Sequence, residues 1–146
     1  VGVLKQFAAD ALAGKLESYI KSEPVVDNTD NNVHVVVGKN FKDIVLDEHK
    51  DVLLEMYAPW CGHCKNLAPA YEELGKRIKE EGIQNVVIAK FDATANDSPH
   101  PQYQARGYPT ILFAKAGSKE TPIKYEGARD ADSMYNWVKK QASAWK

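Results

Sequence analysis

Hydrophobic and polar residues alternate with two different spacings along this chain of 146 residues. From Val1 to Ile20, apolar side chains recur every three or four positions, which is the spacing of one face of a helix. A polar, turn-rich stretch follows, and from Val33 on short apolar runs alternate with helical patterns. The pattern therefore predicts a helix, a linker, and a domain in which strands and helices alternate.

Within that domain, each apolar run and each helical pattern predicts one element. The expected strands are Val33–Val37, Val52–Tyr57, Asn85–Phe91, Thr110–Ala114 and Ile123–Tyr125, of which the last two form a hairpin. The expected helices are Asn40–Leu46, a helix that begins at Cys61, Pro99–Arg106 and Asp130–Ala142, with Asn40 and Asp130 as N-caps. This order is typical of an α/β protein with the thioredoxin fold, a central mixed β-sheet flanked by helices on both faces. The N-terminal helix is an addition to that fold.

Composition and charge exclude several classes of protein. With 44% hydrophobic and 27% charged residues, the chain is typical of a soluble globular protein rather than a disordered one. The formal net charge is −1, so no basic excess favours binding to nucleic acid or to an anionic membrane. Its apolar runs are far shorter than the ~20 residues that a membrane span needs. We therefore expect neither a nucleic acid nor a membrane as partner.

The only two cysteines lie close together in Trp60-Cys61-Gly62-His63-Cys64-Lys65, after a buried strand and at the start of a helix. A structural zinc site needs four ligands, and the chain has no second pair of Cys or His at ligand spacing. A c-type haem attachment needs His directly after the second cysteine, where Lys65 stands. A structural disulfide would close a very small loop and contribute only roughly 2 kcal/mol. The motif favours a redox-active dithiol.

The expected position of the motif explains its reactivity. At a helix N-terminus, free N–H groups and the helix dipole stabilise the Cys61 thiolate, and a protonated His63 adds positive charge. Gly62-His63 thus predicts an enzyme that donates or shuffles disulfides more than one that only reduces them. Cys64 lies one turn inside the helix, as expected of a resolving thiol. Glu55 and Lys90 interrupt two apolar strands and either pair with each other or point into solvent.

The run Tyr57-Ala58-Pro59-Trp60-Cys61-Gly62-His63-Cys64-Lys65 resembles the protein disulfide isomerase family of the endoplasmic reticulum. The likeness continues through Leu67-Ala68-Pro69, Ala89–Thr94 and Arg106–Thr110, and covers Val33 to Ala142. The chain looks like the last (a'-type) catalytic domain of a multidomain member. By this resemblance, residues 1–24 are a helix from the preceding domain, 25–32 a linker and 33–146 the catalytic domain. We expect the chain to be a processed protein or a piece of a longer one.

The resemblance assigns a role to each residue of the site. Cys61 matches the attacking cysteine, Cys64 the resolving cysteine, and Gly62-His63 the dipeptide that tunes them. Glu55 matches a buried acid that assists proton transfer, and Lys90 its charge partner. Arg129 matches an arginine that swings toward the inner cysteine, although the residues alone favour a surface arginine near a helix start. Clients are expected to contact Trp60 and the cis-proline loop at Tyr108-Pro109.

The resemblance also implies what the domain acts on. It predicts a thiol-disulfide oxidoreductase and isomerase whose partners are client proteins with thiols or disulfides, and whose redox partner is glutathione or an oxidase. The implied compartment is the lumen of the endoplasmic reticulum. No metal and no cofactor beyond the Cys61-Cys64 dithiol is expected. The alternative is a thioredoxin-like module that binds clients or partners and in which catalysis is minor.

Overall fold

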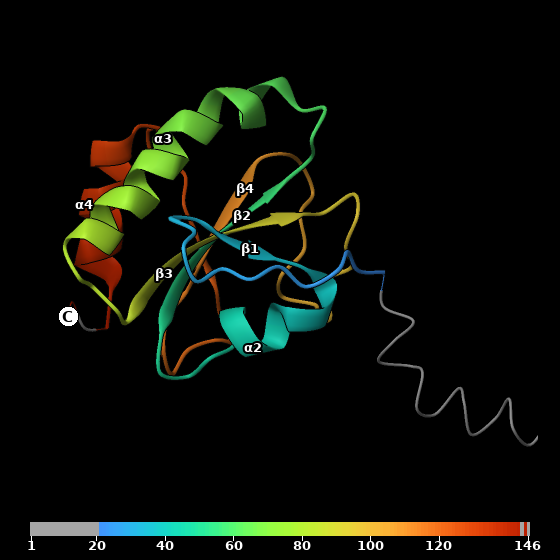
Figure 1. Ribbon diagram of the computed structural model, residues 1–146, viewed down its shortest axis with the longest axis horizontal. Coiled ribbons are helices and arrows are strands. Elements are labelled where there is room, and N and C mark those ends of the chain that lie inside the picture. The colour runs from blue at the N-terminus through green and yellow to red at the C-terminus, as the bar shows by residue number, and fades with distance from the viewer. Residues whose placement is uncertain (1–20, 144, 146) are drawn as a thin grey trace, which may run out of the picture.

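A mixed sheet with strand order β1-β3-β2-β4-β5 forms the centre of the computed structural model, which describes residues 21–143 and 145 (Figure 1). The strands are β1 (His34–Val36), β2 (Asp51–Tyr57), β3 (Val86–Asp92), β4 (Thr110–Ala114) and β5 (Ile123–Lys124). β1, β2 and β3 are parallel, β4 pairs antiparallel with β2, and β5 pairs antiparallel with β4. The helix expected between Val1 and Ile20 lies outside the described residues.

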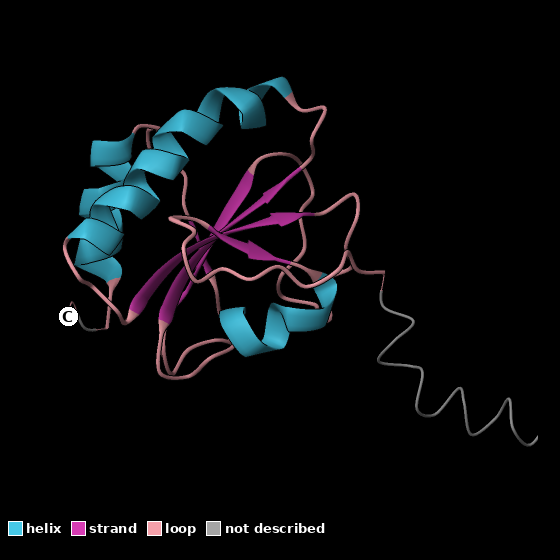
Figure 2. Ribbon diagram, viewed as in Figure 1, coloured by secondary structure: helices cyan, strands magenta, loops and turns pink. Residues whose placement is uncertain are grey.

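Helices cover both faces of the sheet (Figure 2). One face carries the short 3₁₀ turn η1 (Gly38–Asn40) and α2 (Phe41–Val45), and the other carries α3 (Gly62–Glu80) and α4 (Ala131–Gln141). Successive side chains of β2 point to opposite faces of the sheet. Leu53 packs with residues of α3 and α4 on one face, and Leu54 packs with residues of α2 on the other. The predicted thioredoxin fold is thus confirmed. None of the described helices is both long and apolar enough to cross a lipid bilayer.

The predicted helix at Pro99–Arg106 is wrong, because this stretch forms only turns and bends. Pro101 has no N–H to donate and disfavours the helical conformation of the preceding His100. The Ser98 hydroxyl donates instead to the His100 carbonyl, at 3.0 Å, and the Tyr103 N–H closes a single turn onto the same carbonyl, also at 3.0 Å. Two prolines in three residues therefore outweigh the weak helical pattern.

The two predicted N-caps have different outcomes. Asp130 precedes α4 and accepts a hydrogen bond from the Ser133 N–H at 2.7 Å, as expected of an N-cap. Asn40 precedes α2, but its side chain turns back and accepts from the Val37 N–H at 2.8 Å. Asn40 is therefore the N-cap residue of α2, as predicted, but its side-chain oxygen closes the 3₁₀ turn before the helix and makes no hydrogen bond to the helix itself.

Gly75 lies where α3 passes the backbone of Asn32, and a Cβ there would lie 2.4 Å from the Asn32 carbonyl oxygen. We expect Gly75→Ala to lower the free energy of unfolding by about 1–3 kcal/mol, because the clash outweighs the better helix propensity of alanine. Urea denaturation measures the change. Gly107→Ala is the matched control, since its Cβ would meet no atom within 4 Å. Equal losses in the two variants would contradict the close approach of Asn32 to α3.

Candidate active site

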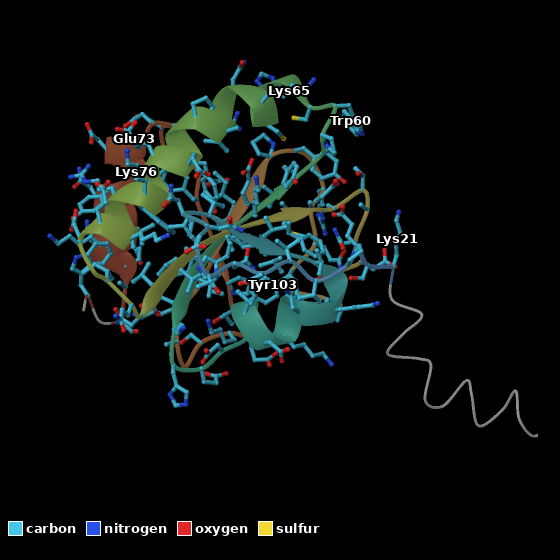
Figure 3. The ribbon with its side chains drawn as sticks, in the orientation of Figure 1. Lys21, Trp60, Lys65, Glu73, Lys76 and Tyr103 are labelled. Atoms are coloured by element: carbon cyan, nitrogen blue, oxygen red, sulfur yellow. The ribbon has the colours of Figure 1, made fainter. Side chains whose placement is uncertain are left out.

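The dithiol stands where β2 ends and α3 begins. Cys61 is the N-cap of α3, with an extended backbone (φ −77°, ψ 119°), and its sulfur accepts from the Cys64 N–H at 3.2 Å. The Cys61 N–H donates to the Ala58 carbonyl at 3.0 Å, which closes the turn that leads out of the strand. Both cysteines are free thiols. Figure 3 shows Trp60 and Lys65 at this same end of α3. The helix N-terminus expected from the sequence is therefore where Cys61 lies.

The two thiols have opposite electrostatic environments. The Cys64 thiol, which hydrogen-bonds to the Cys61 sulfur, is the largest cause that lowers the pKa of Cys61, and the backbone N–H groups of Cys64 and His63 act in the same direction. Burial raises the pKa of Cys64 to about 12, and the neighbouring Cys61 and Glu55 add to this effect. Cys61 is thus the group that ionises first, and Cys64 needs help to lose its proton.

His63 contributes through its backbone. Its N–H lowers the pKa of Cys61, whereas its side chain is exposed at the first turn of α3. Gly62 is exposed as well, and a Cβ there would meet no atom within 4 Å. The charge that a protonated His63 would add remains a prediction.

Glu55 lies beneath the inner cysteine, in the middle of the sheet. It stands opposite Lys90 of β3 and Ile111 of β4, and only 4% of it is exposed. A cavity of about 120 Å³ is lined by Glu55, Cys64 and Lys90 together with the strand end and the first turns of α3. The alternative in which Glu55 points into solvent is therefore wrong, and the carboxyl and the Cys64 thiol share one small space.

The charges around Glu55 do not offset its burial. Burial is the largest effect and raises the pKa of Glu55 to about 7, although the positive charges of Lys90 and Arg129 lower it. Lys90 is half-buried, but among the described residues no ion pair within 4.0 Å joins it to Glu55. Arg129 is exposed in the loop before α4 and acts on the carboxyl from a distance. The carboxyl thus titrates in the range where a proton acceptor and donor is useful.

The raised pKa of Glu55 predicts a pH-dependent stability. The folded value of about 7 lies above the ordinary value of 4.5, so the folded state holds a proton that the unfolded state releases between these values. Relative to Glu55→Gln, the wild-type free energy of unfolding should be highest below pH 4.5, the ordinary pKa. It should fall by up to about 3 kcal/mol as the pH rises through about 7, the pKa in the folded state. Urea unfolding of the two proteins across this range measures the difference, and a difference independent of pH would contradict the raised pKa.

An aromatic pair, the exposed Trp60 and the half-buried Tyr108, flanks the dithiol. Trp60 is 69% exposed and meets Tyr108 edge to face, with ring centroids 5.7 Å apart. Tyr108 also packs against the cluster formed by Ala58 and the two cysteines. The Tyr108–Pro109 peptide bond is cis, as the resemblance implied. Trp60, Tyr108 and Pro109 are therefore brought together beside Cys61.

The sequence did not single out two residues of the site, Tyr57 and Ala58. Tyr57 lines the cavity that holds Glu55 and Cys64, and its burial, with the negative charges of Asp92 and Glu23 nearby, raises the pKa of Tyr57 to about 12. A backbone hydrogen bond from Ala58 lowers the pKa of Cys64, against the effect of burial. Their position in the sequence, between a buried strand and the cysteine motif, was the signal that could have indicated that they belong to the site.

The described part of the chain offers no group of three His, Cys, Asp or Glu side chains placed to hold a metal ion. Its sheet, its helices on both faces and its two cysteines at a helix N-terminus define a thioredoxin-fold domain with a dithiol. The family model described as Thioredoxin matches residues 32–140. The chain belongs to the thioredoxin family.

Its relatives include protein disulfide-isomerases, to which this thioredoxin domain is homologous. It is 53% identical over 141 residues to protein disulfide-isomerase A3 of Gallus gallus, covering 97% of this chain and 27% of that protein. It is 52% identical to protein disulfide isomerase-like 1-4 of Oryza sativa subsp. japonica, covering 96% of this chain and 24% of that one. The chain thus spans about a quarter of the length of these curated relatives.

Solved structures agree with the fold. The first thioredoxin domain of mouse protein disulfide-isomerase A4, determined in solution, is 32% identical, with a TM-score of 0.63 over 85% of this chain and 90% of that domain. Human ERp44, known from a crystal structure, is 26% identical, with a TM-score of 0.63 over 75% of this chain and 33% of that one.

Proposed function

We propose that this domain is a thiol-disulfide oxidoreductase and isomerase that forms, reduces and rearranges disulfides in client proteins. The observation that carries the proposal is the unequal pair of thiols at the start of α3. The pKa of Cys61 is lowered, whereas the pKa of Cys64 is raised to about 12. The Cys64 thiol and the Glu55 carboxyl line the same cavity. A ready nucleophile and a protonated partner beside an acid are what a two-step exchange requires.

In the first step of client reduction, the Cys61 thiolate attacks one sulfur of a client disulfide. The client S–S bond breaks, its other sulfur leaves as a thiolate, and a mixed disulfide joins Cys61 to the client. The backbone N–H of Cys64, 3.2 Å from the Cys61 sulfur, stabilises the thiolate before the attack. The exposed Trp60 and the half-buried Tyr108 supply apolar surface for the client beside this sulfur.

In the second step, Cys64 resolves the mixed disulfide. Its thiol gives a proton to Glu55, and the resulting thiolate attacks the Cys61 sulfur. The bond to the client breaks, the client sulfur leaves as a thiolate, and the Cys61-Cys64 disulfide forms. Lys90 and Arg129 serve as positive charges that favour the ionised form of Glu55. Arg129 is further proposed to move toward Cys64 and ease its ionisation.

The same steps in reverse transfer the disulfide to a client dithiol, and two electrons pass from client to enzyme. Glutathione disulfide or an oxidase then accepts those two electrons and restores the Cys61-Cys64 disulfide, whereas after client reduction reduced glutathione restores the dithiol. Isomerisation needs no net electron transfer, because a second client thiolate attacks the mixed disulfide and frees Cys61. Gly62-His63 tunes the balance by favouring the thiolate, which makes the disulfide a better oxidant. No cofactor beyond the dithiol takes part in this scheme.

The resemblance and the homology to protein disulfide-isomerases support a place within a larger protein. We propose that this is its last catalytic domain and that, since Lys21, Ser22 and Glu23 are hydrogen-bonded to the domain, only the part of the chain before residue 21 belongs to a preceding one. The resemblance to the family of the endoplasmic reticulum supports the lumen of that organelle as the compartment. The proposal of a larger protein agrees with the share of the relatives' length that the chain covers.

Insulin reduction and refolding of scrambled ribonuclease test the proposed activity. We expect the wild-type chain to accelerate both reactions, and the variant with serine at Cys61 and Cys64 to accelerate neither. Wild-type rates no higher than those of the double variant would overturn the proposal. They would favour instead a module that binds clients or partners through Trp60 and Tyr108.

A further inference from the structure

Asn96 holds the segment before β1 onto the domain. Only 2% of Asn96 is exposed, and its side chain makes four hydrogen bonds. Its oxygen accepts from the N–H groups of Glu23, at 2.7 Å, and Gly38, at 3.1 Å. Its nitrogen donates to the Glu23 carboxylate, at 2.9 Å, and to the Asp92 carbonyl, at 3.1 Å. The full hydrogen-bonding capacity of this amide is used, half of it on Glu23.

The residues next to Glu23 are bound as well. The Lys21 N–H donates to the Asp97 carboxylate at 3.1 Å, and the Asp97 N–H donates to the Lys21 carbonyl at 2.7 Å. The Ser22 hydroxyl oxygen accepts from the Lys39 N–H at 3.0 Å. Three consecutive residues are thus bonded to two loops that are distant in sequence, which a free linker would not be.

A second asparagine holds the segment against the edge of the sheet. β1 is an edge strand of the described sheet, so the outward backbone groups of Val35 face no other described strand. The Asn28 oxygen accepts from the Val35 N–H at 2.8 Å, and the Asn28 nitrogen donates to the Val35 carbonyl at 3.1 Å. The amide thus pairs with Val35 as a strand would. Asn31 fixes it in turn by donating to the Asn28 oxygen at 2.9 Å.

This segment reaches the end of the sheet that carries the dithiol. Asn96 lies in the loop after β3, and that loop is tied to the end of β2 by a hydrogen bond from the Ala93 N–H to the Tyr57 carbonyl, at 2.9 Å. Tyr57 lines the cavity under Cys64. Figure 3 places Lys21 on the same side of the molecule as Trp60. The chain therefore enters the domain near its active site.

We infer that residues 21–32 are a strap that belongs to the domain, with Asn28 and Asn96 as its two anchors. The surface it covers, made by Asn96-Asp97, Gly38-Lys39 and the edge of β1, is an interaction surface whose partner is this segment of the same chain. The strap lies almost wholly outside residues 32–140, which the family model matches. It fixes the point at which any preceding part of the chain leaves the domain, and that point lies at the dithiol end.

Native-state hydrogen exchange of the full chain tests the strap at single amides. In the wild type, we expect the amides of Glu23 and Val35 to be protected. Asn96→Ala should speed the exchange of Glu23 by roughly tenfold or more, as expected when a buried side chain that makes several hydrogen bonds is lost. Asn28→Ala should do the same at Val35. Asn136→Ala, on the exposed face of α4, is the matched control and should change neither amide.

A further variant tests the strap without changing a buried residue. The Asp97 side chain is exposed, so Asp97→Ala should leave the core intact and speed the exchange of the Lys21 amide alone. The strap is overturned if the wild-type Glu23 amide exchanges at the rate of an unstructured peptide. Equal protection of Glu23 in the wild type and Asn96→Ala would overturn Asn96 as its anchor. Neither result bears on the proposed activity, which the serine variants of the cysteines test.

Discussion

Serine in place of Cys61 should lower the rates of insulin reduction and of ribonuclease refolding by at least about 1,000-fold, to those of the double serine variant. The reason is that Cys61 is the only thiol with a lowered pKa in the described site, since burial raises the pKa of Cys64 to about 12. Without Cys61, no thiolate is present to attack a client disulfide. Initial rates with wild type and variant at equal concentration measure the loss.

Serine in place of Cys64 is the informative comparison. This variant keeps the attacking thiol but lacks the resolving one, so it should accumulate the mixed disulfide between Cys61 and the client. It should retain more isomerase than reductase activity, because isomerisation needs no second cysteine of the enzyme. Non-reducing electrophoresis after an acid quench detects the adduct. Loss of both activities to the same extent in the two single variants would contradict the division of roles.

Glutamine in place of Glu55 should slow the release of the client from the mixed disulfide by roughly 100-fold, the lower range for removal of a general acid or base. The carboxyl shares a cavity of about 120 Å³ with Cys64, and its pKa is raised to about 7. It therefore holds and releases protons where the reaction runs. Single-turnover kinetics with a fluorescent peptide disulfide separate this step from the initial attack, whose rate should change little.

The pH dependence distinguishes proton transfer from a merely structural role. In the wild type, client release should become faster as the pH rises through about 7, to which burial raises the pKa of Glu55, because the ionised carboxylate accepts the Cys64 proton. In Glu55→Gln this rise should vanish. Glu73→Gln, an exposed carboxylate on α3, is the control and should keep the wild-type profile. Unchanged release in Glu55→Gln would remove Glu55 from the mechanism.

The sequence predicts β1 to β4 well because each lies in an apolar run that packs against helices, whereas β5 is a short exposed strand. Val52–Tyr57 differs from the observed β2 only by Asp51 at its start. Asp51 is fully buried, and its carboxylate accepts from the N–H groups of Ala116, at 2.7 Å, and Ser143, at 2.8 Å. A buried acid of this kind looks like a loop residue in the sequence, because both of its partners are distant along the chain.

In the site, too, some features follow from local sequence and others depend on residues that are distant along the chain. The position of Cys61 follows from a strand, a turn and a helix that are contiguous in the sequence. The shared cavity of Glu55 and Cys64 depends on the register between strands and on α3 above them, which no local pattern contains. The role of Asn96 as an anchor was missed for the same reason, since its partner Glu23 lies in the segment that the resemblance assigns to the preceding domain.

The unequal acidity of the two thiols is tested most directly by alkylation of the reduced chain. Iodoacetamide is added at about pH 7, and each cysteine is quantified by mass spectrometry over time and over a series of pH values. Because only the thiolate reacts, Cys61 should be modified roughly tenfold or more faster than Cys64, which should become reactive only at higher pH. Modification of Cys64 at the same rate as Cys61, or faster, would contradict the assignment of Cys61 as the attacking thiol.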